Sequence, residues 1–78
     1  MKIVFSSHAA QRMQERSVSE EEIAVVIASP EKIGRQGESY IVMKKRENGH
    51  LLIVIYRELL DVIKIITVID TSKVHKYL

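Results

Sequence analysis

The stretch Leu51–Tyr56 (LLIVIY) runs for six apolar residues without a charge, in a chain of 78 residues. A continuous apolar run of this length is typical of a strand that is buried on both faces of a sheet. Leu51–Tyr56 therefore predicts the central strand of the fold.

Strand signals flank this run on both sides. Before it, Asn48-Gly49 is a dipeptide that favours tight hairpin turns, and Ser39–Lys45 has the pattern of a strand. After it, Val62–Ile69 has the same pattern. Together with Leu51–Tyr56, these segments predict a three-stranded antiparallel sheet.

The last predicted strand offers two faces, because successive side chains of a strand point to opposite sides. The more apolar face, which includes Thr67, is predicted to pack against the core. Ile66 and Val68 lie on the other face. Two short helices cover only one face of such a sheet, so the second face is expected to need the C-terminal tail, another subunit or a partner. An ordinary amphipathic sheet with a few exposed aliphatic side chains is the alternative. The predicted core face consists of Ile63, Ile65, Thr67 and Ile69.

Two helices are predicted before the sheet. Lys2–Phe5 is a short β-favouring segment and predicts an edge strand. Ser6 or Ser7 then offers an N-cap for a helix over His8–Arg16, which contains no Gly, Pro or β-branched residue. Ser17 is expected to end this helix.

The second helix begins with a capping box, Ser19-Glu20-Glu21-Glu22. In this motif Ser19 accepts a hydrogen bond from the N–H of Glu22, and the Glu22 side chain returns to the N–H of Ser19. Ser29-Pro30 ends the helix, because the residue before a proline is disfavoured in the α region.

The remaining segments complete a single α+β domain over residues 1–78. Glu31–Gly37 is polar, contains two glycines and predicts a loop, and residues 70–78 predict a loose or short helical tail. The expected order is a short strand, two helices and then the three-stranded antiparallel sheet (β-α-α-β-β-β).

Composition excludes several classes of site. The chain has no cysteine, which excludes disulfides and thiolate metal sites, and its three histidines are too scattered to suggest zinc. No uncharged run approaches the length of a membrane helix, which takes about 20 residues. We therefore expect a soluble cytoplasmic protein without a metal, a cofactor or a membrane partner.

The charge is mildly basic. The net charge is +2, and residues 31–78 carry nine Lys and Arg against six Asp and Glu. Such a bias suits a nucleic-acid or acidic protein partner, although it is also ordinary for a soluble protein.

The first predicted helix carries the candidate catalytic residues. His8, Arg12 and Arg16 are spaced by four residues and therefore line one stripe of the helix. Guanidinium groups grip phosphate oxygens, and an imidazole transfers protons near neutral pH, so the stripe suits phosphodiester chemistry. In the structural alternative, nearby glutamates pair with the arginines and His8 caps its own helix.

Three further residues are candidates for substrate binding by position. Arg57 ends the central strand, Lys64 lies within the last strand, and Thr67 is expected on the core face. A cation inside a strand has to reach water or a partner, so a solvated side chain is the alternative for Lys64.

The segment Ser7–Ile23 resembles the opening of the family known as domain of unknown function 4258, whose members carry an S-x-H-A-x-x-R-M-x-x-R pattern. The end of the second helix near Pro30, and strands similar to Leu52–Tyr56 and Ile65–Val68, extend this resemblance over nearly the whole chain. The order of elements also resembles the compact toxins of the RelE, ParE and BrnT kind, in which helices pack on one face of an antiparallel sheet.

This resemblance implies an mRNA-cleaving fold that an antitoxin peptide neutralises. In RelE-type ribonucleases the ribose 2′-hydroxyl attacks the adjacent phosphate without a metal. Their working residues lie mostly on the sheet and the tail, where Arg57, Lys64, His75 and Tyr77 are positional matches. ParE relatives share the fold but act on gyrase.

The leading hypothesis is therefore a ribonuclease-like toxin whose partners are RNA and an antitoxin. The competing hypotheses are a non-catalytic module that binds protein or nucleic acid, and a domain in which His8 and the arginines only stabilise the fold. A homodimer or a hetero-complex through the second sheet face is expected in either functional case.

Overall fold

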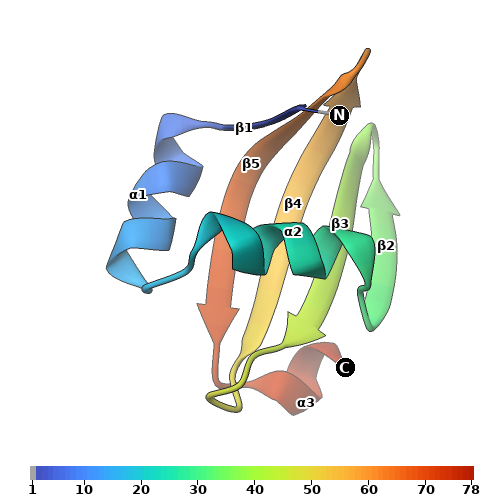
Figure 1. Cartoon of the computed structure of the whole chain (residues 1–78). Coiled ribbons are helices and arrows are strands. Elements are labelled where there is room, and N and C mark those ends of the chain that lie inside the picture. The colour runs from blue at the N-terminus through green and yellow to red at the C-terminus, as the bar shows by residue number, and fades with distance from the viewer. Residues whose placement is uncertain (1) are drawn as a thin grey trace.

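In the computed structural model, which describes residues 2–78, five strands form one mixed sheet in the order β1-β5-β4-β3-β2 (Figure 1). The outer strand β1 runs parallel to β5, and the other neighbours are antiparallel. Along the chain the elements are β1 (Lys2–Phe5), α1 (Ser7–Glu15), α2 (Glu20–Ala28), β2 (Lys32–Gln36), β3 (Ser39–Lys45), β4 (Leu51–Leu59), β5 (Val62–Thr71) and α3 (Val74–Tyr77).

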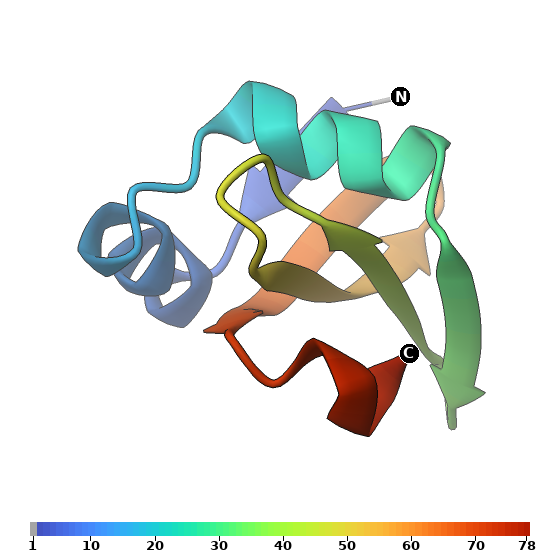
Figure 2. The same ribbon diagram turned by 90° about the horizontal axis from the view of Figure 1, so that it is seen from below.

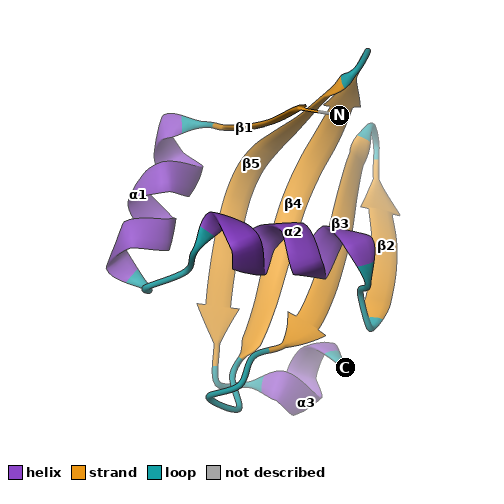
Figure 3. Ribbon diagram, viewed as in Figure 1, coloured by secondary structure: helices purple, strands orange, loops and turns teal. Residues whose placement is uncertain are grey.

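The predicted α+β class is confirmed, but the sheet is larger than the three strands expected. The predicted antiparallel strands are β3, β4 and β5, and β1 extends the sheet at one edge (Figure 3). The loop predicted over Glu31–Gly37 is wrong, because Lys32–Gln36 pairs with β3 as the strand β2. β2 is an edge strand whose side chains are mostly exposed. Its polar residues and its glycine therefore give it the composition of a loop.

The sheet separates two unequal faces. Helices α1 and α2 lie on one of them, here called the helix face, and α3 lies on the other, here called the outer face (Figure 2). The helix face carries the main core, whose fully buried members from the sheet and from both helices include Ala9, Ile23, Val42, Leu52, Val54 and Ile65.

A β-bulge in β5 changes which of its residues reach this core. Tyr56 pairs with Ile65 and Ile55 pairs with Thr67, so Ile66 is an extra residue between them. Strict alternation resumes one residue later, and Val68 rather than Thr67 is buried in the core. The prediction that Thr67 and Ile69 share the core face is therefore wrong, and Ile69 is 39% exposed.

Ser6 connects the first helix to this bulge. Its hydroxyl accepts a hydrogen bond from the N–H of Ala9 at 3.0 Å, which makes Ser6 the N-cap of α1. The same hydroxyl donates to the carbonyl of the bulged residue Ile66 at 2.7 Å. One side chain therefore satisfies both the start of the helix and a carbonyl of the irregular strand.

The turn between α1 and α2 is closed by a left-handed residue, Ser17, at φ 54°. The N–H of Val18 donates to the carbonyl of Met13 at 2.8 Å, and both side chains are buried. This is the Schellman arrangement that ends many helices. At the start of α2, Ser19 accepts from the N–H of Glu22 at 3.1 Å as predicted.

The outer face is only partly covered. Leu51 and Ile53 are buried there outside the main core, while Ile41, Met43 and Ile55 are half-buried. The α3 segment lies on this face, and the carbonyl of Tyr77 accepts a hydrogen bond from Lys32 Nζ at 2.7 Å. No helix within residues 2–78 is long and apolar enough to cross a membrane.

Ser6→Ala is expected to lower the free energy of unfolding by about 1–3 kcal/mol, because the cap and the Ile66 hydrogen bond are lost together. Ser7→Ala is the matched control, since Ser7 is exposed and lies next in the chain. Urea unfolding followed by circular dichroism measures both. Equal midpoints for the two variants would contradict the double role of Ser6.

The ionisation of the Tyr56 phenol makes the free energy of unfolding depend on pH in the alkaline range. Burial raises the pKa of this phenol above its ordinary value of 10.0, and Glu58 and Tyr40 raise it further. Above about pH 10 the unfolded state therefore loses this proton more readily than the folded state, so stability falls as the pH rises. Tyr56→Phe is expected to unfold like the wild type at pH 7 and to lose less stability between about pH 9 and about pH 11. An identical alkaline loss in thermal melts of both proteins would rule this out.

Candidate functional site

The candidate site lies where α1 crosses the open edge of β5. β1 pairs with β5 only as far as Phe5 opposite Ile65, so within residues 2–78 the outer edge of β5 has no strand partner beyond that point. The chain leaves β1 into α1, which packs on β5 instead. A cavity of about 290 Å³ lies between the two elements, and its lining is Arg12, Arg16, Thr67, Val68, Ile69 and Asp70.

The two arginines of this cavity are available for a ligand. Arg12 and Arg16 are exposed, and neither forms a salt bridge with another of the residues that the structure describes. The glutamate pairing considered in the structural alternative does not involve Glu22, which binds another arginine. Two exposed arginines one helical turn apart therefore line a cavity beside an open strand edge.

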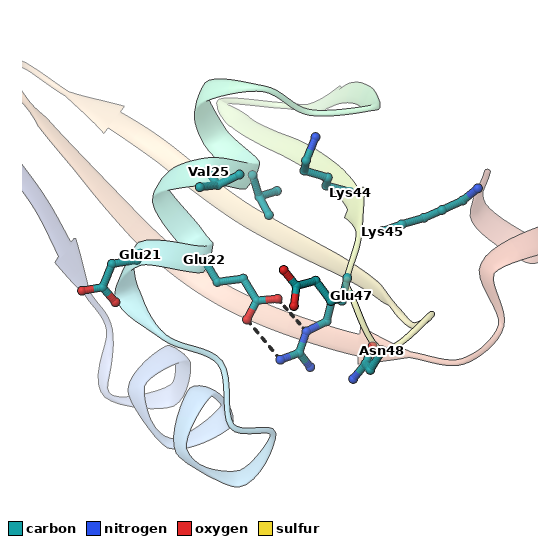
Figure 4. A pocket seen from close by; sticks show the side chains of 9 residues that line it. Glu21, Glu22, Val25, Lys44, Lys45, Glu47 and Asn48 are labelled. Atoms are coloured by element: carbon teal, nitrogen blue, oxygen red, sulfur yellow. Dashed lines mark hydrogen bonds and ion pairs between the residues drawn. The ribbon is translucent and has the colours of Figure 1, made fainter.

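That other arginine, Arg46, organises the base of the site. Its guanidinium binds both carboxylate oxygens of Glu22, at 2.7 and 3.1 Å, and the capping-box return of Glu22 to Ser19 is therefore not formed (Figure 4). It also binds Asp70 at 3.3 Å and the carbonyl of Ser17 at 3.2 Å. The Arg46 side chain is only 10% exposed and the Asp70 side chain only 9%.

The electrostatics of Arg46 follow from these partners. The hydrogen bond with Glu22 raises the pKa of Arg46 most, burial opposes that rise, and Asp70 adds to it. Arg46 therefore stays cationic while it joins the β3–β4 turn to α2 and β5.

His50 is attached to the same cluster through Asp70. Its Nδ1 lies 3.2 Å from each of the two carboxylate oxygens of Asp70, and its side chain is 42% exposed. Nε2 forms no hydrogen bond within residues 2–78. Every buried side-chain nitrogen or oxygen in these residues has a hydrogen-bond partner, so Nε2 is not buried. Nε2 is therefore accessible to solvent or to a ligand.

A second, larger cavity of about 560 Å³ lies between α2 and the β3–β4 hairpin (Figure 4). Its lining includes Val25 and Val26 together with glutamates and lysines. One of these cations, Lys44, already donates to the carbonyl of Ser29 at 2.8 Å. The smaller cavity differs in that it is lined by two arginines without an ion pair, and Asp70 connects it to Arg46.

The structure brings some of the predicted site residues together. Arg12, Arg16 and Thr67 line one cavity, although Thr67 reaches it from the outer-face side of β5. His8 is exposed one helical turn before Arg12 and is not among the lining residues.

The other two candidates lie elsewhere. Arg57 and Lys64 are paired across β4 and β5, near the hairpin that joins these strands, and neither lines the cavity. Arg57 forms an ion pair with Glu38.

Sequence reasoning missed the cluster of Glu22, Arg46, His50 and Asp70. One signal was available, because Asp is depleted in strands and Asp70 follows directly on an apolar strand. The bulge at Ile66 places Val68 on the helix face. Asp70 lies two residues further along the strand and therefore shares that face. In the described chain no group of three or more His, Cys, Asp or Glu side chains is arranged to hold a metal.

Comparison with known families adds one result. The family model for the domain of unknown function DUF4258 matches residues 5–70. The chain belongs to the DUF4258 family. The matched region includes both walls of the cavity and the whole Arg46 cluster. No curated protein and no solved structure is significantly similar to the chain.

Arg46→Met is expected to lower the free energy of unfolding by about 2–3 kcal/mol, because it leaves two carboxylates without their cation. Lys45→Met is the matched control on the same hairpin, and its exposed side chain predicts a change of about 0.5 kcal/mol or less. Guanidinium chloride unfolding at neutral pH separates the two. A similar, small loss of unfolding free energy in both variants would show that the Arg46 cluster does not stabilise the fold.

Proposed function

We propose that this protein is a ribonuclease-like toxin that binds RNA at the α1–β5 cavity and cleaves it by metal-independent acid–base chemistry. The observation that supports this most directly is the pair of uncommitted guanidinium groups, Arg12 and Arg16, at a cavity that also contains Thr67 and Asp70. Guanidinium groups bind phosphate oxygens through two parallel hydrogen bonds, and their charge steers a polyanion to the site.

The chemistry follows from the RNA itself. The ribose 2′-oxygen attacks the adjacent phosphorus, the bond from phosphorus to the 5′-oxygen breaks, and the products are a 2′,3′-cyclic phosphate and a 5′-hydroxyl. Arg12 and Arg16 stabilise the negative charge that develops on the phosphate oxygens. His8 lies on the same helical stripe and is the imidazole that the sequence offers for proton transfer. Arg57 and Lys64 pair near the β4–β5 hairpin, outside the lining residues, and the proposal assigns no step of this chemistry to them.

The proposal includes the RelE, ParE and BrnT type of fold. Its support is the packing of α1 and α2 on one face of a sheet whose central strands are antiparallel. A toxin of this kind acts in the cytoplasm and has a protein antitoxin as its partner.

A non-catalytic binding module is the second candidate. It is favoured by the outer face, where Ile41, Met43 and Ile55 are only half-buried and Ile69 is exposed. A face of this kind suits contact with an antitoxin or with a second copy of the chain. In this case the protein binds its partner and shows no turnover.

Induced expression in a bacterial host tests the proposal. The wild type is expected to arrest growth and to deplete intact RNA on a gel. Arg12→Gln combined with Arg16→Gln, and His8→Ala alone, are expected to lower this toxicity, because phosphate binding and proton transfer are lost.

Arg35→Gln is the control for the loss of a cation. Arg35 is exposed on β2 and its guanidinium lies over the ring of Tyr40, outside the cavity. Normal growth and intact RNA with the wild type would count against the ribonuclease and favour the binding module. Growth arrest that persists in the double arginine variant would instead remove the cavity from the proposal.

A further inference from the structure

We propose that Asp70 recognises ribose in the α1–β5 cavity, so that this site binds ribonucleotides in preference to deoxyribonucleotides. Arg12 and Arg16 hold the phosphate of one nucleotide, and the carboxylate of Asp70 accepts a hydrogen bond from its 2′-hydroxyl. This role concerns the same RNA that the proposed function assigns to the cavity, and it therefore rests on that function.

The two walls of the cavity offer opposite kinds of hydrogen-bonding group. The α1 wall carries Arg12 and Arg16, whose guanidinium groups only donate hydrogen bonds. The β5 wall carries Asp70, whose ionised carboxylate only accepts them. A ligand that satisfies both walls therefore presents an acceptor, such as a phosphate, close to a donor, such as a hydroxyl group.

RNA presents this combination on every nucleotide. Its 2′-hydroxyl lies on the same ribose as the 3′-phosphate, whereas DNA has a hydrogen atom in place of that hydroxyl. Proteins distinguish RNA from DNA through this group, which both donates and accepts hydrogen bonds. A bound deoxyribonucleotide leaves the acceptor on the β5 wall without a partner from the ligand, and an unpaired polar group lowers affinity.

The cavity has the size of a site for one small unit. It holds about 290 Å³, whereas pockets for drug-sized ligands range from about 300 to about 1,000 Å³. Its other lining groups suit a sugar phosphate, because the Thr67 hydroxyl can donate or accept and the half-exposed Ile69 offers aliphatic surface to the sugar ring. A ribose with its phosphate is therefore the part of RNA that we place here.

The charge of Asp70 still allows an anion to bind. Arg12 and Arg16 together outweigh this one carboxylate, so the lining keeps a net positive charge. Arg46 also binds Asp70 at 3.3 Å from outside the lining, and it offsets part of the repulsion that the carboxylate exerts on a phosphate.

The carboxylate of Asp70 is held in place and keeps capacity for a ligand. Its protein partners are Arg46, at 3.3 Å, and Nδ1 of His50, at 3.2 Å from each oxygen. A carboxylate has about four acceptor positions, so these two partners leave room for a hydroxyl donor. Selection between ligands that differ in one hydroxyl depends on such a fixed acceptor, because a mobile one adapts to either ligand.

NMR titration of the ¹⁵N-labelled full chain with two small nucleotides tests the role of Asp70. Adenosine 3′-monophosphate carries a 2′-hydroxyl beside its phosphate, and 2′-deoxyadenosine 3′-monophosphate lacks it. Neither phosphate has a nucleoside leaving group, so binding is measured without cleavage. The wild type is expected to bind the ribonucleotide about 10-fold more tightly, because the deoxyribonucleotide loses a hydrogen bond to a charged group. Amide shifts are expected at residues 12–16 and 67–70.

Two substitutions of Asp70 separate the hydroxyl contact from the effect of charge. Asp70→Ala removes the acceptor and is expected to bind the two nucleotides with affinities within about twofold of each other. Asp70→Asn keeps the size of the side chain, serves where the alanine variant does not fold, and is expected to lower the preference about threefold or more. Loss of the negative charge strengthens the binding of both nucleotides alike, so the ratio of the two dissociation constants reports the hydroxyl contact.

Asp61→Asn is the matched control. Asp61 is an exposed aspartate in the turn between β4 and β5, outside the cavity, and its replacement makes the same change in net charge. The Asp61 variant is expected to keep the wild-type preference for the ribonucleotide.

The outcomes separate the role of Asp70 from the proposed function. Equal affinity of the wild type for both nucleotides, or an unchanged preference in the Asp70 variants, would overturn this role and leave the ribonuclease intact. A preference that Asp61→Asn also loses would show a general effect of charge and would overturn it too. If the wild type binds neither nucleotide, the role of Asp70 is overturned together with the phosphate site, and RNA loss after induced expression then decides whether a ribonuclease remains.

Discussion

The guanidinium group of Arg46 joins parts of the chain that otherwise share few contacts. It bonds to Glu22 at the start of α2, to the carbonyl of Ser17 in the turn before it, and to Asp70 near the end of β5. Removing a cation from water is costly, and the cost is offset only when its hydrogen-bonding groups find good partners. Here two carboxylates and the backbone of the α1–α2 turn supply them. This one side chain therefore ties that turn, and with it the cavity beside α1, to the sheet.

The bulge at Ile66 makes this arrangement possible. Without the extra residue, strict alternation would place Asp70 on the outer face, away from Arg46 and α2. With it, Val68 enters the core and Asp70 follows on the same face. The bulge also frees the carbonyl of Ile66, which Ser6 binds at the start of α1. A single irregularity thus sets both the direction of the first helix and the carboxylate at the base of the cavity.

These two features explain how far the sequence predicted the molecule. The central strands and both helices were correctly predicted because their signals are local: an apolar run, a hairpin dipeptide and capping serines. The strand β2 was missed because an edge strand exposes most of its side chains and resembles a loop in composition. The predicted core face of β5 was wrong beyond Ile65, because strict alternation of side chains cannot reveal an inserted residue.

The same reasoning applies to the site. The period of a helix predicts that Arg12 and Arg16 share one stripe, and both line the cavity. Thr67 joins them in the cavity, but the argument that led to it assumed the wrong face of β5. Arg46, His50 and Asp70 come from segments that the chain order keeps apart, and each one alone resembles an ordinary solvated side chain. Only the pairing of β4 with β5, and the reach of Arg46 across the helix face, bring them together.

The location of the cavity follows from a general difficulty of sheets. An open strand edge presents unpaired N–H and C=O groups, and proteins protect such edges by covering them. In this chain β1 ends opposite Ile65, and α1 covers the rest of β5 in its place. A helix cannot pair with a strand along its whole edge, so space remains between them, and the arginines of α1 border that space. The helix that covers this edge of β5 therefore also carries the two arginines that border the cavity, and guanidinium groups of this kind suit a phosphate ligand.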